Sequence, residues 1–230
     1  TEGRLALNNK CFARKTNRKK PISLPVNLEP MFIPEHYKNT DTNEIHAFLK
    51  ANSFGILIST IEGKPWGTHI PLELDTDSQG KEVLVGHIAK ANPQSKHLVD
   101  GNQVLCIFNG PHSYVSSSWY QKEEVPTWNY VAVHVYGTIR IQSKDELLLA
   151  LHALVDKYEK ASEHPISLHD MSPKTMRQVT GIVGFEICVE ELQAVHKLSQ
   201  GREHDHPKII EELEQQGQGS KAIAEAMKKL

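Results

Sequence analysis

The chain has 230 residues, of which 39% are hydrophobic, and a formal net charge of −2, which suits one large domain or one domain with appendages. The 23% of charged residues argue against a disordered chain, and the small net charge predicts no strong attraction to nucleic acid or to a membrane surface. No run in the sequence approaches the roughly 18 consecutive apolar residues that a membrane-spanning helix needs.

The first thirty residues differ from the rest in charge. They hold seven Lys and Arg side chains against two glutamates, show little apolar periodicity and end in the proline-rich stretch from Pro21 to Pro30. We therefore expect residues 1–30 to be a flexible basic leader, with a nucleic-acid-binding or targeting arm as the alternative. Cys106 and Cys188 lie inside apolar runs, which predicts buried thiols and a reducing, cytoplasmic location.

The first half of the body alternates between one helix and several strands. Residues 31–53 are expected to be helical, with Thr42 as a cap and Ile45, Phe48 and Leu49 at helical spacing. The apolar runs at 54–60 and 69–75 flank a link with Gly and Pro, which indicates a hairpin. Further along the chain we expect a strand at 81–89, a short helix at 91–101 and a strand at 103–110.

The second half begins with a poorly periodic connector at 110–128, of a length that is usually functional. Residues 129–142 form an expected fifth strand, with valines on one face and Tyr130, His134 and Tyr136 on the other. The remaining expected elements are helices at 145–159 and 172–181, a strand at 182–195, and two short tail helices separated by the GQG run at 217–219. Consecutive antiparallel strands with helices at the ends predict an α+β barrel, not a parallel doubly wound sheet.

One local pattern suggests an anion site. A strand ends at Ala89, and Asn92 with Pro93 suits a helix start, where exposed N–H groups attract anions. Lys90 stands just before this start, where a cation is unfavourable unless an anion lies between. His87, Lys90 and Asn92 could therefore hold a phosphate, and an ordinary strand–helix turn with a solvated lysine is the alternative.

The connector and the following strand are rich in aromatic residues with polar handles. Trp119 and Trp128 suit a flat ring ligand or a subunit interface, with Thr127 and Asn129 as hydrogen-bonding groups. Core packing at a barrel rim is the alternative. No nucleophile elbow, dinucleotide fingerprint or phosphate loop is present in the sequence, so we assign no catalytic residue, and no metal site.

Taken together, several motifs resemble the PaiB family, known as FMN-binding negative transcriptional regulators. The matching runs are MFIPEHY (31–37), GHIAKANPQ (86–94), FNGPHSYVSSSWY (108–120), VPTWNYVAVHVYG (125–137), GIVGFEI (181–187) and HKLSQGR (196–202). The runs are collinear and span nearly all of residues 31–230. Two positions depart from the family pattern, since Lys90 stands where the family usually has Arg and Ser117 where it has Pro.

The resemblance implies an antiparallel split β-barrel over 31–200 with peripheral helices, followed by a helical tail at 201–230. It also implies a homodimer that binds flavin mononucleotide (FMN) in a groove between subunits. By motif position, His87, Lys90 and Asn92 would face the phosphate. Trp119, Thr127, Trp128 and Asn129 would lie near the flavin or the partner subunit, and His69 is a looser candidate for the same site.

For function, the resemblance implies a cytoplasmic, FMN-binding transcriptional regulator. Direct DNA binding has little support, because the body is acidic and the tail helices are short, so repression could be indirect. The alternative is a flavin-dependent oxidoreductase on the same barrel, since a fold does not fix a function. A haem-binding barrel, with His134 or a histidine of the tail as the axial ligand, is a third interpretation.

Overall fold

The computed structural model describes residues 31–230, so the predicted leader at 1–30 lies outside the described residues. Within them the strands are β1 (Lys38–Asn39), β2 (Phe54–Ile61), β3 (Lys64–Thr76), β4 (Glu82–Ala89), β5 (Gln103–Val115), β6 (Thr127–Ile141) and β7 (Ile182–Lys197). The α-helices are α1 (Thr42–Ala51), α2 (Lys144–Glu159), α3 (Pro173–Met176), α4 (His206–Glu214) and α5 (Gln218–Met227). No helix among residues 31–230 has both the length and the apolar character to cross a membrane.

The strands close into a barrel. Every pairing is antiparallel, in the order β1-β7-β4-β3-β2-β5-β6, and a further pairing joins β6 back to β7. The ring β7-β4-β3-β2-β5-β6 is therefore continuous, which confirms the predicted α+β barrel. Its interior is filled by residues that alternate along the strands, including Leu57, Leu72, Phe108, Val135 and Phe185, all fully buried.

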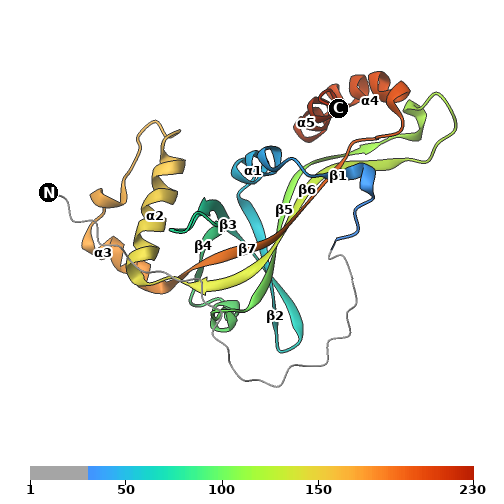
Figure 1. Cartoon of the computed structure of the whole chain (residues 1–230). Coiled ribbons are helices and arrows are strands. Elements are labelled where there is room, and N and C mark those ends of the chain that lie inside the picture. The colour runs from blue at the N-terminus through green and yellow to red at the C-terminus, as the bar shows by residue number, and fades with distance from the viewer. Residues whose placement is uncertain (1–30) are drawn as a thin grey trace, which may run out of the picture.

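Three strands extend beyond the barrel as an arm. We use "arm" for the end of β5, the start of β6 and the end of β7, which run together towards α4 and α5 (Figure 1). A second apolar cluster lies between this arm and the two C-terminal helices, and its members include Val115, Val131, Ile209, Leu213 and Ile223. The tail helices thus stabilise the arm by covering its apolar side.

Several predicted boundaries are corrected. The helix expected over 31–53 is confined to α1, and Asp41, not Thr42, caps it by accepting from the N–H groups of Asn43 and Glu44. The helix expected at 91–101 is only the 3-10 turn η2 (Pro93–His97), although Asn92 does cap it. The connector expected at 110–128 is strand up to Val115 and again from Thr127, with a 3-10 turn between.

A close contact in β5 and the start of α2 show how local sequence affects these elements. At Gly110 a Cβ would fall 2.5 Å from the ring of Phe48 in α1 and 3.0 Å from the carbonyl oxygen of Val131, so a larger residue would displace the Phe48 ring. The ladder shifts register here, between Asn109 and His112. By contrast, α2 begins as its sequence predicts, because Ser143 and Glu146 form a reciprocal capping box.

Cys106 is a fully buried free cysteine, as predicted, and burial raises the pKa of its thiol. The prediction of a buried thiol is wrong for Cys188 in β7, which is half-buried and disulfide-bonded.

Candidate functional site

The outer face of the barrel carries two of the candidate residues. Leu72 pairs with Gly86, and both are buried inside the barrel, so the neighbouring positions on β3 and β4 point outwards. This places His69 and His87 on the same outer face. His87 is half-buried, and burial lowers the pKa of its imidazole, so the ring is neutral near pH 7.

An exposed aromatic side chain lies beside His69. Phe54 of β2 is 66% exposed, and its ring lies 6.3 Å from that of His69 at an interplanar angle of 28°. A large apolar ring left in solvent next to a histidine is unusual for a barrel surface and provides a flat surface for a ligand or a second protein.

Beyond the end of β4, the chain turns through Lys90 and Asn92. The ammonium of Lys90 donates to the carbonyl of Thr180 at 2.6 Å, and the Lys90 N–H donates to Gly181. The Asn92 side chain accepts from the Gln94 N–H at 2.9 Å and donates to Thr68 of β3 at 3.0 Å. Asn92 therefore links the η2 turn to β3. Lys90 and Asn92 both make side-chain hydrogen bonds to other residues of the same chain.

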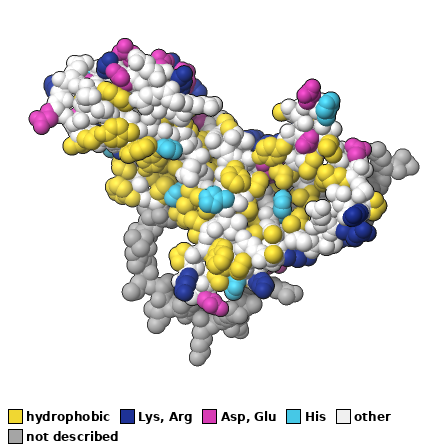
Figure 2. Space-filling view, turned by 180° about the vertical axis from the view of Figure 1, so that it is seen from behind, with side chains coloured by type: hydrophobic (Ala, Val, Ile, Leu, Met, Phe, Trp, Pro, Cys, Tyr) yellow, Lys and Arg dark blue, Asp and Glu magenta, His cyan; other side chains and the backbone are white. Residues whose placement is uncertain are grey.

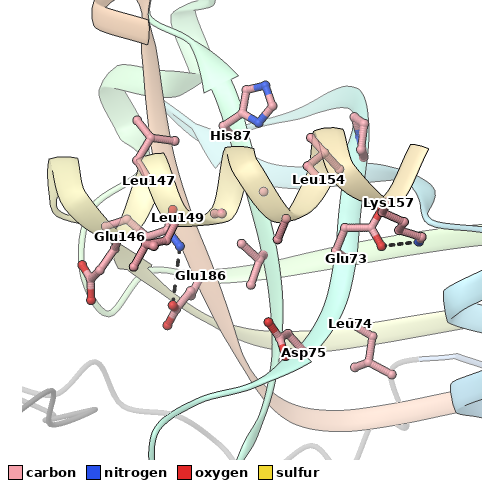
Figure 3. A pocket seen from close by; sticks show the side chains of 16 residues that line it. Glu73, Leu74, Asp75, His87, Glu146, Leu147, Leu149, Leu154, Lys157 and Glu186 are labelled. Atoms are coloured by element: carbon pink, nitrogen blue, oxygen red, sulfur yellow. Dashed lines mark hydrogen bonds and ion pairs between the residues drawn. The ribbon is translucent and has the colours of Figure 1, made fainter. Parts of the chain in front are cut away.

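A groove separates α2 from the outer face of β3, β4 and β7 (Figure 3). Its volume is about 560 Å³, and His87 lies on its strand wall while Leu147, Leu149 and Leu154 line its helix wall. Two of its carboxylates are ion-paired: Glu73 accepts from Lys157 at 2.6 Å, and Glu186 accepts from Arg140 at 2.7 Å. Asp75 also lines the groove and has no ion pair among the described residues, so the groove joins an apolar helix wall to a strand wall with charged side chains.

The other four candidates lie on the arm. Asn129 is fully buried, where its amide donates to Ser199 Oγ at 2.9 Å and to Met227 Sδ at 3.6 Å, and accepts from Ser199 at 3.2 Å. Thr127 accepts from the Lys197 ammonium at 2.5 Å. Trp119 packs against the C-terminal apolar cluster, whereas Trp128 is 53% exposed beside the rings of His112 and Tyr114.

These two groups of candidates are far apart within one chain. Ala89 pairs with Ile182 at the first residue of β7, whereas Tyr130 pairs with Lys197 at its last. Ile182 and Lys197 are the ends of the 16-residue strand β7, which spans up to about 50 Å when fully extended. Within one chain, therefore, the β4 end with Lys90 and Asn92 does not meet Thr127 and Trp128. Nor do the side chains of His87 and Lys90 line one cavity, since Lys90 lies on a second pocket next to Thr180.

Between the two groups lies an outer face of half-exposed apolar residues. One row crosses five strands through His69, Ile56, Ile107, His134 and Gln193. In this row His134 Nδ1 and Gln193 Oε1 are buried without a hydrogen-bond partner among the described residues. Figure 2 shows histidines set among hydrophobic side chains on this side of the molecule, with charged side chains mostly towards its edges.

The comparisons with known proteins agree with this architecture. A family model described as "Putative FMN-binding domain" matches residues 31–191. The chain is 44% identical over 200 residues to the "Protease synthase and sporulation protein PAI 2" of Bacillus subtilis, which covers 86% of this chain and 96% of that protein.

The chain belongs to the PaiB family. Its domain is an FMN-binding domain, and the cofactor predicted from the sequence is confirmed as FMN.

Solved structures show the split-barrel fold of this PaiB family member at lower identity. The FAD and heme binding protein from Mycobacterium smegmatis is 13% identical, covers 70% of this chain and 73% of its own, and has a TM-score of 0.56. The flavocytochrome Anf3 from Azotobacter vinelandii is 14% identical, covers 70% of this chain and 69% of its own, and has a TM-score of 0.51.

Three residues near the candidates were not singled out from the sequence. Phe54 is the first residue of the apolar run at 54–60, and its exposure follows only from the barrel register. Lys197 and Arg202 lie within the run HKLSQGR (196–202). On the arm, the Lys197 ammonium donates to Thr127. The guanidinium of Arg202 lies 5.7 Å from the centre of the Tyr120 ring. The concentration of cations at the end of β7 was the available signal.

Proposed function

We propose that the protein is a homodimeric, cytoplasmic, FMN-binding regulator of the PaiB type, with each FMN held between two subunits. The observation that carries this proposal is the separation of the candidate residues. One group lies at the barrel face and the end of β4, the other on the arm, at opposite ends of β7. A second copy of the chain would supply the arm for the barrel face of the first.

The barrel face suits the phosphate end of FMN. Lys carries three N–H donors, and the Lys90 ammonium makes one hydrogen bond, to Thr180, among the described residues. Two donors and the positive charge are available for a phosphate oxygen. The second N–H of the Asn92 amide is a further donor at the same turn, and the exposed imidazole of His69 lies on β3, the strand that Asn92 contacts through Thr68. In the proposal, the cation and the amide bind the phosphate, and His69 adds a donor.

The aromatic residues suit the flavin ring. Exposed Phe54 beside His69 on the barrel, and exposed Trp128 on the arm, both present flat surfaces for stacking. In the proposed dimer, Trp119, Thr127 and Trp128 of the arm would approach the ring from the partner, while Asn129 would hold the arm in shape. Bound FMN would supply a redox-active ring, and the residues of the chain would bind and orient it.

The same face supports dimerisation. The half-exposed row from His69 to Gln193 crosses the barrel beside a second apolar row that contains Ile58, Leu105 and Tyr136. Burial of such a surface against a second copy would contribute roughly 25 cal/mol per Å². It would also offer hydrogen-bond partners to His134 Nδ1 and Gln193 Oε1. Sedimentation should show a dimer at micromolar concentration, and a monomer would contradict the proposal.

Regulation through another protein is favoured over direct contact with DNA. The apolar sides of α4 and α5 are buried against the arm, and residues 206–230 hold four lysines and four glutamates, so the tail carries no excess of positive charge to attract a phosphate backbone. The oxidoreductase alternative is not favoured, because the relative with 44% identity is named for protease synthesis and sporulation and not for an oxidoreductase.

The test is flavin binding by four proteins, measured as quenching of flavin fluorescence. The ligands are FMN and riboflavin, which lacks the phosphate. Lys90→Ala should weaken FMN about ten- to hundredfold, the range for a hydrogen bond to a charged group, and leave riboflavin nearly unchanged. Lys90→Arg should keep or improve FMN binding, because a guanidinium grips phosphate in two places. Lys221→Ala, an exposed cation on α5, is the matched control and should bind as the unaltered protein does.

Equal weakening of both flavins by Lys90→Ala would show that Lys90 supports the fold and does not hold the phosphate. An intense Soret band in the freshly purified protein would favour haem over flavin. Binding of neither flavin by any of the four proteins would reject the proposed FMN site.

A further inference from the structure

A second cavity lies on the side of α2 that faces α3. Its volume is about 660 Å³, within the range of small-molecule sites. α2 supplies Leu147 and Leu148, β7 supplies Ile182 and Val183, and Met176 and Val179 come from α3 and the following 3-10 turn η5 (Arg177–Gly181). The two helices lie side by side away from the barrel axis in Figure 1. The cavity is therefore apolar on three sides.

The charged residues that line this cavity all have the same sign. Lys90, Lys144 and Arg177 line it, and its lining includes no carboxylate. The side chains of Lys144 and Arg177 have no ion pair or hydrogen bond among the described residues. Lys144 also stands in the first turn of α2, where the helix dipole disfavours a cation. Three cations around an apolar hollow repel one another unless an anion lies between them.

Of the two acidic side chains in the first turn of α2, Asp145 does not line the cavity, and Glu146 is directed elsewhere. Glu146 accepts from the Ser143 N–H at 2.7 Å and pairs with Arg140 at 3.0 Å, on the side of the groove that contains Glu186. The positive charge of the cavity is thus not neutralised by the helix that forms its wall.

We propose that this cavity binds a small organic carboxylate with an apolar tail, such as a medium-chain fatty acid. The tail would displace water from Leu148, Met176 and Val179, and the carboxylate would lie between Lys144 and Arg177. Lys90 borders the cavity, but its ammonium donates to Thr180, so the argument rests on the other two cations. Lys90 also borders the proposed FMN site, but the carboxylate site uses Lys144 and Arg177 and does not depend on flavin binding.

The test is calorimetric titration of the full chain with decanoate. We expect one site per chain. Lys144→Ala with Arg177→Ala should weaken decanoate about tenfold or more, the usual loss on removal of charged hydrogen bonds. The double variant Lys221→Ala with Lys229→Ala removes the same charge from the C-terminal segment and should bind as the unaltered protein does. Decyltrimethylammonium, with the same tail and the opposite charge, should not bind.

Three results would overturn the proposal. Equal binding of decanoate and decyltrimethylammonium would indicate unselective apolar adsorption. Equal losses in both double variants would indicate an effect of net charge alone. Competition between FMN and decanoate would place the cavity within the flavin site. Failure of FMN to bind while decanoate binds would reject the proposed FMN site and leave this inference intact.

Discussion

Replacement of Asn129 by alanine should destabilise the arm and leave flavin affinity unchanged. The Asn129 amide is fully buried and exchanges two hydrogen bonds with Ser199, which is also buried. Alanine would leave the Ser199 hydroxyl without its partner in the interior, at a cost of about 1–3 kcal/mol. The lost contact with Met227 of α5 and the small cavity add to this cost, so we expect about 2–3 kcal/mol in total.

For a chain of this size, 2 kcal/mol corresponds to a fall in melting temperature of about 4–8 °C. Thermal denaturation followed by circular dichroism measures it. Asn102→Ala is the control, since this exposed side chain makes one hydrogen bond, to the carbonyl of His97, and should change stability by less than about 0.5 kcal/mol. An unchanged melting temperature together with a large loss of FMN affinity would refute this reasoning and make Asn129 a flavin ligand.

Three further predictions concern the fold. Gly137→Ala should destabilise the protein by about 1–3 kcal/mol in chemical denaturation, because a Cβ there would overlap the carbonyl oxygen of Cys188; unaltered stability would refute this close approach. Burial lowers the pKa of His87, His134 and His196 below 6.5. As the pH falls, these three imidazoles are therefore protonated in the unfolded chain before they are protonated in the folded chain. The free energy of unfolding should therefore fall as the pH drops from about 6.5 through the lower folded-state pKa values, and it should not depend on these histidines well above pH 6.5. His134→Gln should reduce the dependence of this free energy on pH, as measured by urea titrations at several pH values. Deletion of residues 1–30 should leave the melting temperature nearly unchanged when both proteins are compared under reducing conditions, in which Cys188 is not disulfide-bonded, and a large loss would show that the leader packs on the body.

The elements with strong local signals were predictable. α2 carries its own capping box, and the alternation of apolar residues located β2, β4 and β6. The pairing of β6 with β7 was not predictable, because it joins strands that are separated by two helices and closes the barrel only when all the other strands are present. β1 has two residues, too few for any periodic signal.

The candidate site was predictable in composition and not in placement. His87, Lys90 and Asn92 are close in sequence, yet the alternation of β4 turns His87 to the outer face and the turn after Ala89 directs Lys90 to Thr180. Asn129 has the polar character of a ligand residue, but α5 and Ser199 cover it, and neither contact is local in sequence. Motif position therefore identifies the residues, and the tertiary fold decides which of them can reach a ligand.

The central claim, an FMN site shared by two subunits, is tested most directly with mixed dimers. Lys90→Ala alters the barrel face and Trp128→Ala alters the arm, and each homodimer should bind FMN weakly. When both variants are co-expressed with different tags and the mixed dimer is isolated, one site combines both altered residues and the other has neither. The account predicts that the mixed dimer recovers about one FMN per dimer with the affinity of the unaltered protein. Weak binding at both sites of the mixed dimer would contradict it and place the whole FMN site within one subunit.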